Sequence, residues 1–272
     1  MKLTAQGLAG IGAALLLTGI AGCRVDRSFI YHPSREIEMT PEAAGLAYED
    51  VYFNASDGVR LNGWYVPAND PKAVMILFHG NAGNISHRVQ NLRRLHDELG
   101  VSVFIFDYRG YGLSEGDASE MGTYLDAEAA LEYVRAKTGL EADQIVYFGR
   151  SLGAGVAVEL ALRAPPRALI LETPFTSIRE MARRVFPWLP TGLMIRTEYD
   201  SLSKIGRIDA PLLVLHGDQD EVVPLEVGRK LFEAANPPKS FYLIPGASHN
   251  NTYDVGGKPY WDAWKTFLSG LP

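Results

Sequence analysis

The chain has 272 residues, of which 47% are hydrophobic and 21% are charged, and its formal net charge is −6. This composition is that of a globular protein and excludes a disordered or collagen-like chain, and the length fits one large domain or two small ones. A mildly acidic chain lacks the basic surface that a phosphate backbone requires, so no nucleic-acid partner is expected.

The N-terminal residues have the pattern of an export signal. Lys2 precedes an apolar run over residues 8–20, which is shorter than the roughly 20 residues that span a bilayer and has the basic start and small-residue end of a secretory signal. The last residue of the run, Ile20, is followed by Ala-Gly-Cys, which resembles the bacterial lipoprotein signal, in which a cysteine after a small residue is lipidated and becomes the mature N-terminus. Cys23 is the only cysteine in the sequence. We therefore predict a lipoprotein-type signal peptide at residues 1–22 and lipidation of Cys23.

This resemblance also predicts where the protein is found. Lipoproteins carry several acyl chains, which hold a protein firmly to a membrane, so we expect a lipid-anchored protein of the bacterial cell envelope, on the periplasmic side of the inner or outer membrane. A cleaved signal without lipid and an uncleaved anchor are the alternatives. Residues 23–47, with Pro33 and Pro41, are predicted to be a tether and lead-in in which His32 is exposed.

Residues 48–272 are predicted to form one α/β domain. The runs 51–55 and 61–66 are separated by Asp57-Gly58, a hairpin signal. Nearly continuous apolar runs, typical of parallel strands covered on both faces, then follow at residues 73–78, 101–106, 144–148, 168–171, 212–215 and 241–244. Helix-length segments lie between them. This alternation predicts a mostly parallel central sheet of about eight strands flanked by helices, with an antiparallel edge.

The segment between the fourth and fifth of these later runs is a predicted insertion. It covers about residues 173–209 and is a short cap over the sheet, with apolar residues that either line an acyl groove or pack on the sheet: Phe175, Phe186, Trp188, Leu189 and Met194. Because ligands of such sheets bind beyond the carboxyl ends of the strands, motifs at strand ends are the candidates for chemistry.

One strand end carries a candidate nucleophile. Residues 149–153 read Gly-Arg-Ser-Leu-Gly and lie between the run 144–148 and a helix-like segment, which is the setting that the G-x-S-x-G motif requires. The glycines leave room for a strained serine backbone. The motif alone is weak, but its strand and helix favour Ser151 as the nucleophile and the N–H of Leu152 as an oxyanion donor. Arg150 is expected to form a local ion pair.

A serine hydroxyl needs a base, and histidine suits this role near neutral pH. Of the six histidines, only His216 and His249 follow Ser151 in the chain. On an α/β sheet with this motif the chain order is nucleophile, acid, histidine, and only His249 leaves room for an acid after a later strand. We predict His249 as the base. Asp220 is the predicted acid, with Asp218 as the near alternative and Glu172 as a more distant one.

The loop after the first apolar run is the predicted second half of the oxyanion hole. Residues 79–84 read His-Gly-Asn-Ala-Gly-Asn, and small residues let backbone N–H groups approach a ligand. Asn81 is the first choice as donor and Ala82 the second, while His79 is expected to support the loop. The segment lacks the Lys-Ser/Thr ending of a phosphate-binding P-loop. Neither a metal-ligand cluster nor a cofactor motif is present in the sequence, so no metal and no cofactor are expected.

Together these motifs resemble one branch of the α/β-hydrolase superfamily, the bud-emergence-like hydrolases of fungi and the depalmitoylase-like serine hydrolases of animals. The matching segments are HGNAGN (79–84), DYRGYGLSEG (107–116), GRSLGAGVA (149–157), HGDQDEVVP (216–224) and GASHNNTY (246–253). The resemblance implies the same triad of Ser151, Asp220 and His249 and an oxyanion donor at Asn81. It also marks Asp107, Tyr108 and Arg109, which we interpret as structural support. Ala154 departs from the pattern, since many relatives have glycine there.

The predicted function is therefore that of a serine hydrolase. The short cap suits small acyl ester or thioester substrates at a membrane surface, and the mechanism passes through an acyl-enzyme intermediate. One alternative is a serine peptidase of the prolyl-peptidase type, although such enzymes usually carry a large additional domain. The other is a catalytically inactive binding module, against which the filled triad positions count.

Overall fold

The computed structural model describes residues 30–185, 188 and 196–271. The predicted signal peptide and Cys23 lie outside the described residues, as do Phe186, Leu189 and Met194 of the predicted cap. Within the described part of the chain, no helix has both the length and the apolar character that crossing a membrane would need.

The domain is built on one eight-stranded sheet with the order β1-β2-β4-β3-β5-β6-β7-β8. The strands are β1 (Glu49–Asn54), β2 (Arg60–Val66), β3 (Val74–Phe78), β4 (Ser102–Phe106), β5 (Ile145–Arg150), β6 (Ala168–Glu172), β7 (Leu212–Gly217) and β8 (Lys239–Ile244). The β1–β2 and β2–β4 pairs are antiparallel and all the others are parallel. The predicted mostly parallel sheet with an antiparallel hairpin at its edge is confirmed.

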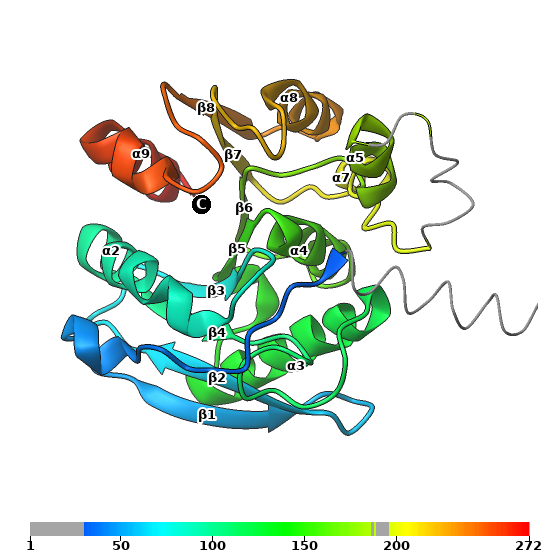
Figure 1. Ribbon diagram of the computed structural model, residues 1–272. Helices are drawn as coiled ribbons and strands as arrows, with labels where there is room; N and C mark the ends of the chain where they lie inside the picture. The colour runs from blue at the N-terminus through cyan, green and yellow to red at the C-terminus, as the bar shows by residue number, and fades with distance from the viewer. Residues whose placement is uncertain (1–29, 186–187, 189–195, 272) are drawn as a thin grey trace, which may run out of the picture.

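Helices cover both faces of the sheet (Figure 1). One face packs against α2 (Val89–Leu99) and α9 (Thr252–Ser269), and the other against α3 (Glu120–Thr138), α4 (Leu152–Arg163) and α8 (Leu225–Ala234). The shorter elements are η1 (Pro41–Ala44), η2 (Ile85–Arg88), η3 (Ala142–Gln144), α5 (Ile178–Val185) and α7 (Leu202–Ile205).

The side chains of β5 show why the central strands are apolar without alternation. Val146 and Phe148 belong to the hydrophobic core under α2 and α9, whereas Ile145 and Tyr147 belong to the core under α3 and α4. Successive side chains of a strand point to opposite faces, and both faces are buried here. The strand continues two residues beyond its apolar run because Arg150 still pairs with Glu172 of β6.

The first described residues pack on the domain. Gly83 N–H donates to His32 O over 3.0 Å, Ser34 N–H donates to Gly83 O over 2.9 Å, and Gly112 N–H donates to Ser34 O over 2.9 Å. Residues 32–34 of the predicted tether therefore lie along the loop that follows β3, while the side chain of His32 is exposed as expected. Sequence reasoning did not foresee this packing.

Candidate active site

Ser151 lies in a sharp turn between β5 and α4, with φ of 51° and ψ of −116°. A positive φ is strained for a residue with a side chain. A Cβ at Gly149 would meet Gly153 O at 2.5 Å, and a Cβ at Gly153 would meet Phe78 O at 2.0 Å. Real Cβ atoms do not approach backbone that closely, so the two glycines of the motif are needed where they stand.

The structure brings the three predicted triad residues together. His249 Nε2 lies 3.0 Å from Ser151 Oγ, and His249 Nδ1 lies 2.9 Å from Asp220 Oδ2 and 3.1 Å from Asp220 Oδ1. The histidine follows β8 and the aspartate follows β7, so the three groups meet at the carboxyl ends of the parallel strands. With Nδ1 protonated and donating to the carboxylate, Nε2 is free to accept the serine proton.

Asp220 is held in its ionised form. Its Oδ1 accepts hydrogen bonds from the N–H groups of Val222 at 2.9 Å and Val223 at 2.8 Å. Burial alone would raise the pKa of this carboxyl, but hydrogen bonds from His216 and His249 and the charge of His249 outweigh burial and lower the pKa well below its usual value of 3.8. An ionised carboxylate at this place can orient the imidazole and stabilise its charged form.

The two alternative acids have other partners. Asp218 Oδ1 accepts a hydrogen bond from Gly246 N–H over 2.7 Å and so closes the turn beside β8. Glu172 is fully buried and accepts hydrogen bonds from Arg150 Nε at 2.9 Å and Thr252 Oγ1 at 2.9 Å. Neither carboxylate contacts the imidazole of His249. Glu172 instead supports the histidine loop, because Arg150 also donates to His249 O over 2.5 Å.

Leu152 is the first residue of α4, and N–H groups in the first turn of a helix have no acceptor within it. Asn81 lines the same cavity as Ser151, but its side chain is bound elsewhere: Oδ1 accepts hydrogen bonds from His32 N–H at 3.2 Å and Tyr111 OH at 2.8 Å, and Nδ2 donates to Ile30 O. The backbone N–H of Asn81 is thus the group that this residue can offer to an oxyanion.

The base of this loop is a buried, uncharged pair. His79 Nδ1 donates to Gly80 O over 2.8 Å, which leaves Nε2 unprotonated at 3.5 Å from Asp107 Oδ1. That distance is within ion-pair range, but burial lowers the pKa of His79 to about 3 and raises the pKa of Asp107 to about 8, so we assign the pair as neutral. Tyr108 OH also donates to His79 O over 3.0 Å. His79 and Tyr108 therefore support this loop, as expected.

A cavity of about 560 Å³ opens over Ser151 and His249. Its apolar lining comes from Phe175, Ile178, Met181, Val185, Val222 and Val223, and its polar lining includes His87, Arg88, Arg150 and Asn250. A hollow of about 580 Å³ between β8 and α9 contains none of the triad residues, so side-chain geometry rather than size identifies the site. No cluster suited to a metal ion occurs among the described residues.

Two features of the site were missed in the sequence. The first is the support of the loop 79–84 by hydrogen bonds with residues 30–36, and the second is Arg88, which lines the cavity. Arg88 lies four residues beyond the matching segment 79–84, and nothing in the sequence shows that it lines the same cavity as Ser151.

The chain is similar to several known proteins. A family model described as "Serine aminopeptidase, S33" matches residues 69–199. The chain is 35% identical over 289 residues to the alpha/beta hydrolase domain-containing protein WAV2 of Arabidopsis thaliana, covering 96% of this chain and 91% of that protein. It is 32% identical over 263 residues to the protein bem46 of Schizosaccharomyces pombe, covering 91% and 87%. Among solved structures, the esterase Pf2001 of Pyrococcus furiosus superposes with a TM-score of 0.75 at 23% identity, covering 89% of this chain and 98% of that one.

Proposed function

Because the chain belongs to the α/β-hydrolase family that includes WAV2 and bem46, we propose that it is a serine hydrolase that cleaves acyl esters or thioesters through an acyl-enzyme intermediate. The observation that carries the proposal is the unbroken line of contacts from Asp220 through His249 to Ser151, with 2.9 Å and 3.0 Å between the bonded atoms. These distances suit proton transfer from a serine hydroxyl to an imidazole.

In the proposed reaction, His249 Nε2 takes the proton of Ser151 Oγ while the oxygen attacks the carbonyl carbon of the substrate. The oxyanion that forms accepts hydrogen bonds from the N–H groups of Leu152 and Asn81. The imidazolium, stabilised by Asp220, then gives its proton to the leaving alcohol or thiol. Water then attacks the carbonyl carbon of the acyl-enzyme, with the same histidine as base. The bond to Ser151 Oγ breaks, the serine takes back the proton, and the carboxylic acid is released.

The charges around the cavity favour this proposal over a peptidase that recognises a free amino terminus. An ammonium group needs a carboxylate partner when it leaves water. The described residues that line the cavity include no aspartate and no glutamate, whereas they include Arg88 and Arg150. The apolar wall formed with α5 suits an acyl chain instead.

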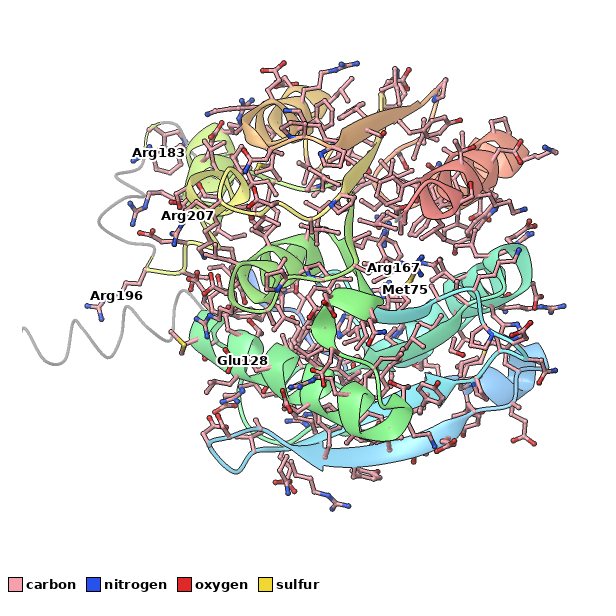
Figure 2. All side chains as sticks on the ribbon, turned by 180° about the vertical axis from the view of Figure 1, so that it is seen from behind. Met75, Glu128, Arg167, Arg183, Arg196 and Arg207 are labelled. Carbon is pink, nitrogen blue, oxygen red and sulfur yellow. The ribbon has the colours of Figure 1, made fainter. Side chains whose placement is uncertain are left out.

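We also propose that Cys23 is lipidated and holds the site close to a membrane. Ile30 lines the cavity, and the seven Cα-to-Cα steps from Cys23 to Ile30 reach at most about 25 Å. The start of the described chain lies on the side of the molecule that carries α5, and Figure 2 shows Arg183 and Arg207 pointing outward from that side. Such cations are attracted to anionic lipid headgroups.

A fluorophosphonate probe tests the proposed chemistry, since it labels an activated serine. We expect the wild type to be labelled and to hydrolyse short acyl esters. Ser151→Ala should lose the label and reduce ester hydrolysis by on the order of 10³-fold or more. A label that persists in this variant places the nucleophile elsewhere, and a folded wild type that neither labels nor hydrolyses any acyl ester supports a binding module.

A further inference from the structure

Arg88 is a cation in the active-site cavity without a carboxylate partner. It lines the same cavity as Ser151 and His249. Its Nη2 donates to two neutral acceptors, Ala82 O at 2.8 Å and Asn81 O at 3.4 Å, and its Nε is buried without any hydrogen-bond partner. Among the described residues, no carboxylate lies within ion-pair distance of the guanidinium. A guanidinium has five N–H donors, so this one keeps capacity for an anion.

The nearby charged groups do not neutralise Arg88. Asp107 is close enough to act on it, but burial raises the pKa of Asp107 to about 8, so this carboxyl is mostly protonated at neutral pH. The charge of Arg150 is matched by Glu172, 2.9 Å away. Burial and then the charge of Arg150 lower the pKa of Arg88 to about 10, which leaves it charged at neutral pH. An incompletely hydrated cation of this kind gains from an anionic partner.

The position of Arg88 indicates which part of the substrate it meets. Its electrostatic neighbours include Arg150 and Tyr253, and Arg150 donates to the backbone of His249. Arg88 is therefore hydrogen-bonded to the loop 79–84 and lies within electrostatic range of Arg150, which holds the histidine loop, whereas α5 provides apolar side chains to the lining. In a serine hydrolase the leaving group is the part that receives the proton of the histidine.

We propose that Arg88 binds a negatively charged group on the leaving alcohol or thiol, so that the preferred substrates are acyl esters or thioesters whose leaving group carries a carboxylate or a phosphate. The inference rests on the proposed hydrolase function and names its substrate class. An apolar acyl chain and an anionic leaving group together describe an amphiphile, which matches a cavity with an apolar lining and a cationic edge.

Two pairs of synthetic esters test the proposal. The butyryl ester of 4-hydroxybenzoate is compared with the butyryl ester of its methyl ester, and 4-butyryloxyphenyl phosphate with its dimethyl phosphate ester. Arg88→Met removes the charge but keeps most of the side-chain length. We expect it to lower kcat/KM by about 10- to 100-fold for the charged ester of at least one pair, and by no more than about threefold for the neutral esters. The pair that responds tells carboxylate from phosphate.

Arg88 also donates to two carbonyls of the oxyanion loop, residues 79–84. Further variants are therefore needed to separate binding of the substrate anion from support of this loop. Arg88→Lys should retain much of the preference for the charged ester. Arg94→Met, the loss of an exposed arginine from α2, should leave the preference unchanged. In the wild type, added salt should reduce the preference, since salt screens partly exposed charges.

The outcomes are distinct. If Arg88→Met slows charged and neutral esters equally, or if the wild-type preference is absent or insensitive to salt, the anion subsite is wrong while the hydrolase function stands. If the wild type hydrolyses none of the four esters and takes up no fluorophosphonate, the proposed function itself is wrong.

Discussion

At the scale of single residues, the acid of the triad is the position that offers the sharpest test. Asp220 contacts the imidazole of His249, whereas Asp218 closes a turn and Glu172 binds Arg150. An asparagine at the acid position keeps the shape but favours the wrong tautomer of the histidine. We predict that Asp220→Asn loses roughly 10²–10⁴-fold in kcat with little change in KM.

Asp218→Asn and Glu172→Gln are the matched controls for steady-state kinetics. Both should lose much less turnover provided that they stay folded, as circular dichroism can establish. If Asp220→Asn keeps near-normal turnover while one of the controls collapses, the acid is assigned to the wrong residue, although Ser151 and His249 could retain their roles.

The buried pair of His79 and Asp107 predicts a pH effect on stability. The carboxyl titrates near 3.8 when exposed and at about 8 in the folded protein, so the native state binds this proton more tightly. The stabilisation is complete below about pH 4 and is lost as the pH rises through 8. The side chain of Asp107→Asn cannot ionise. The free energy of unfolding of this variant should therefore rise relative to that of the wild type as the pH increases from 4 to 8.

The gain can reach several kcal/mol, since one unit of pKa difference corresponds to about 1.4 kcal/mol. Urea unfolding at pH 5 and pH 8 measures it, with the exposed Asp117→Asn as a control for the loss of one charge. A difference between Asp107→Asn and the wild type that does not change with pH would show that Asp107 is ionised in the folded protein.

At the scale of elements, the N-terminal segment (residues 30–38) packs on the oxyanion loop (residues 79–84). The side chain of Asn81 joins them through Ile30 and His32, and it also accepts a hydrogen bond from Tyr111. Asn81→Ala keeps the backbone N–H but removes these contacts. We predict that kcat falls by about 10-fold or more, because a small displacement of an oxyanion donor weakens transition-state binding, with KM nearly unchanged.

Two comparisons make this result specific. Tyr111→Phe removes a single hydroxyl contact and should show a smaller loss of kcat. Glu38→Gln alters an exposed contact of the same segment with His87, which contributes little, and should match the wild type. Wild-type kcat in a folded Asn81→Ala protein would mean that the segment packs on the loop without positioning it.

At the scale of the whole molecule, the proposed lipidation site lies a few residues before the segment that packs on the loop 79–84. If Cys23 is lipidated, a short linker ties the bilayer to the segment that braces the oxyanion loop. We predict that Cys23→Ser abolishes incorporation of a labelled fatty acid in the native host and leaves the protein uncleaved or released from the membrane. A wild type that takes up no lipid would instead indicate an ordinary signal.

The sequence by itself predicted the sheet and the sharp turn that holds Ser151, the candidate nucleophile. Strand runs and the turn at Ser151 are local patterns, since burial on both faces and a strained strand-to-helix turn each leave their mark on adjacent residues. Strand ends without apolar side chains leave no such pattern. The apolar runs therefore missed the last two residues of β5 and the first two residues of β8. Chain order added His249 as the candidate base.

The tertiary structure decided what depends on residues far apart in the chain. Which carboxylate reaches His249 was settled across 29 positions, and the contact of that histidine with Ser151 spans 98. The contacts of residues 30–36 with the loop 79–84 and the unpaired charge of Arg88 likewise appear only after folding. The type of a residue does not show whether its side chain has a partner, because only the packing of the folded chain determines which atoms come into contact.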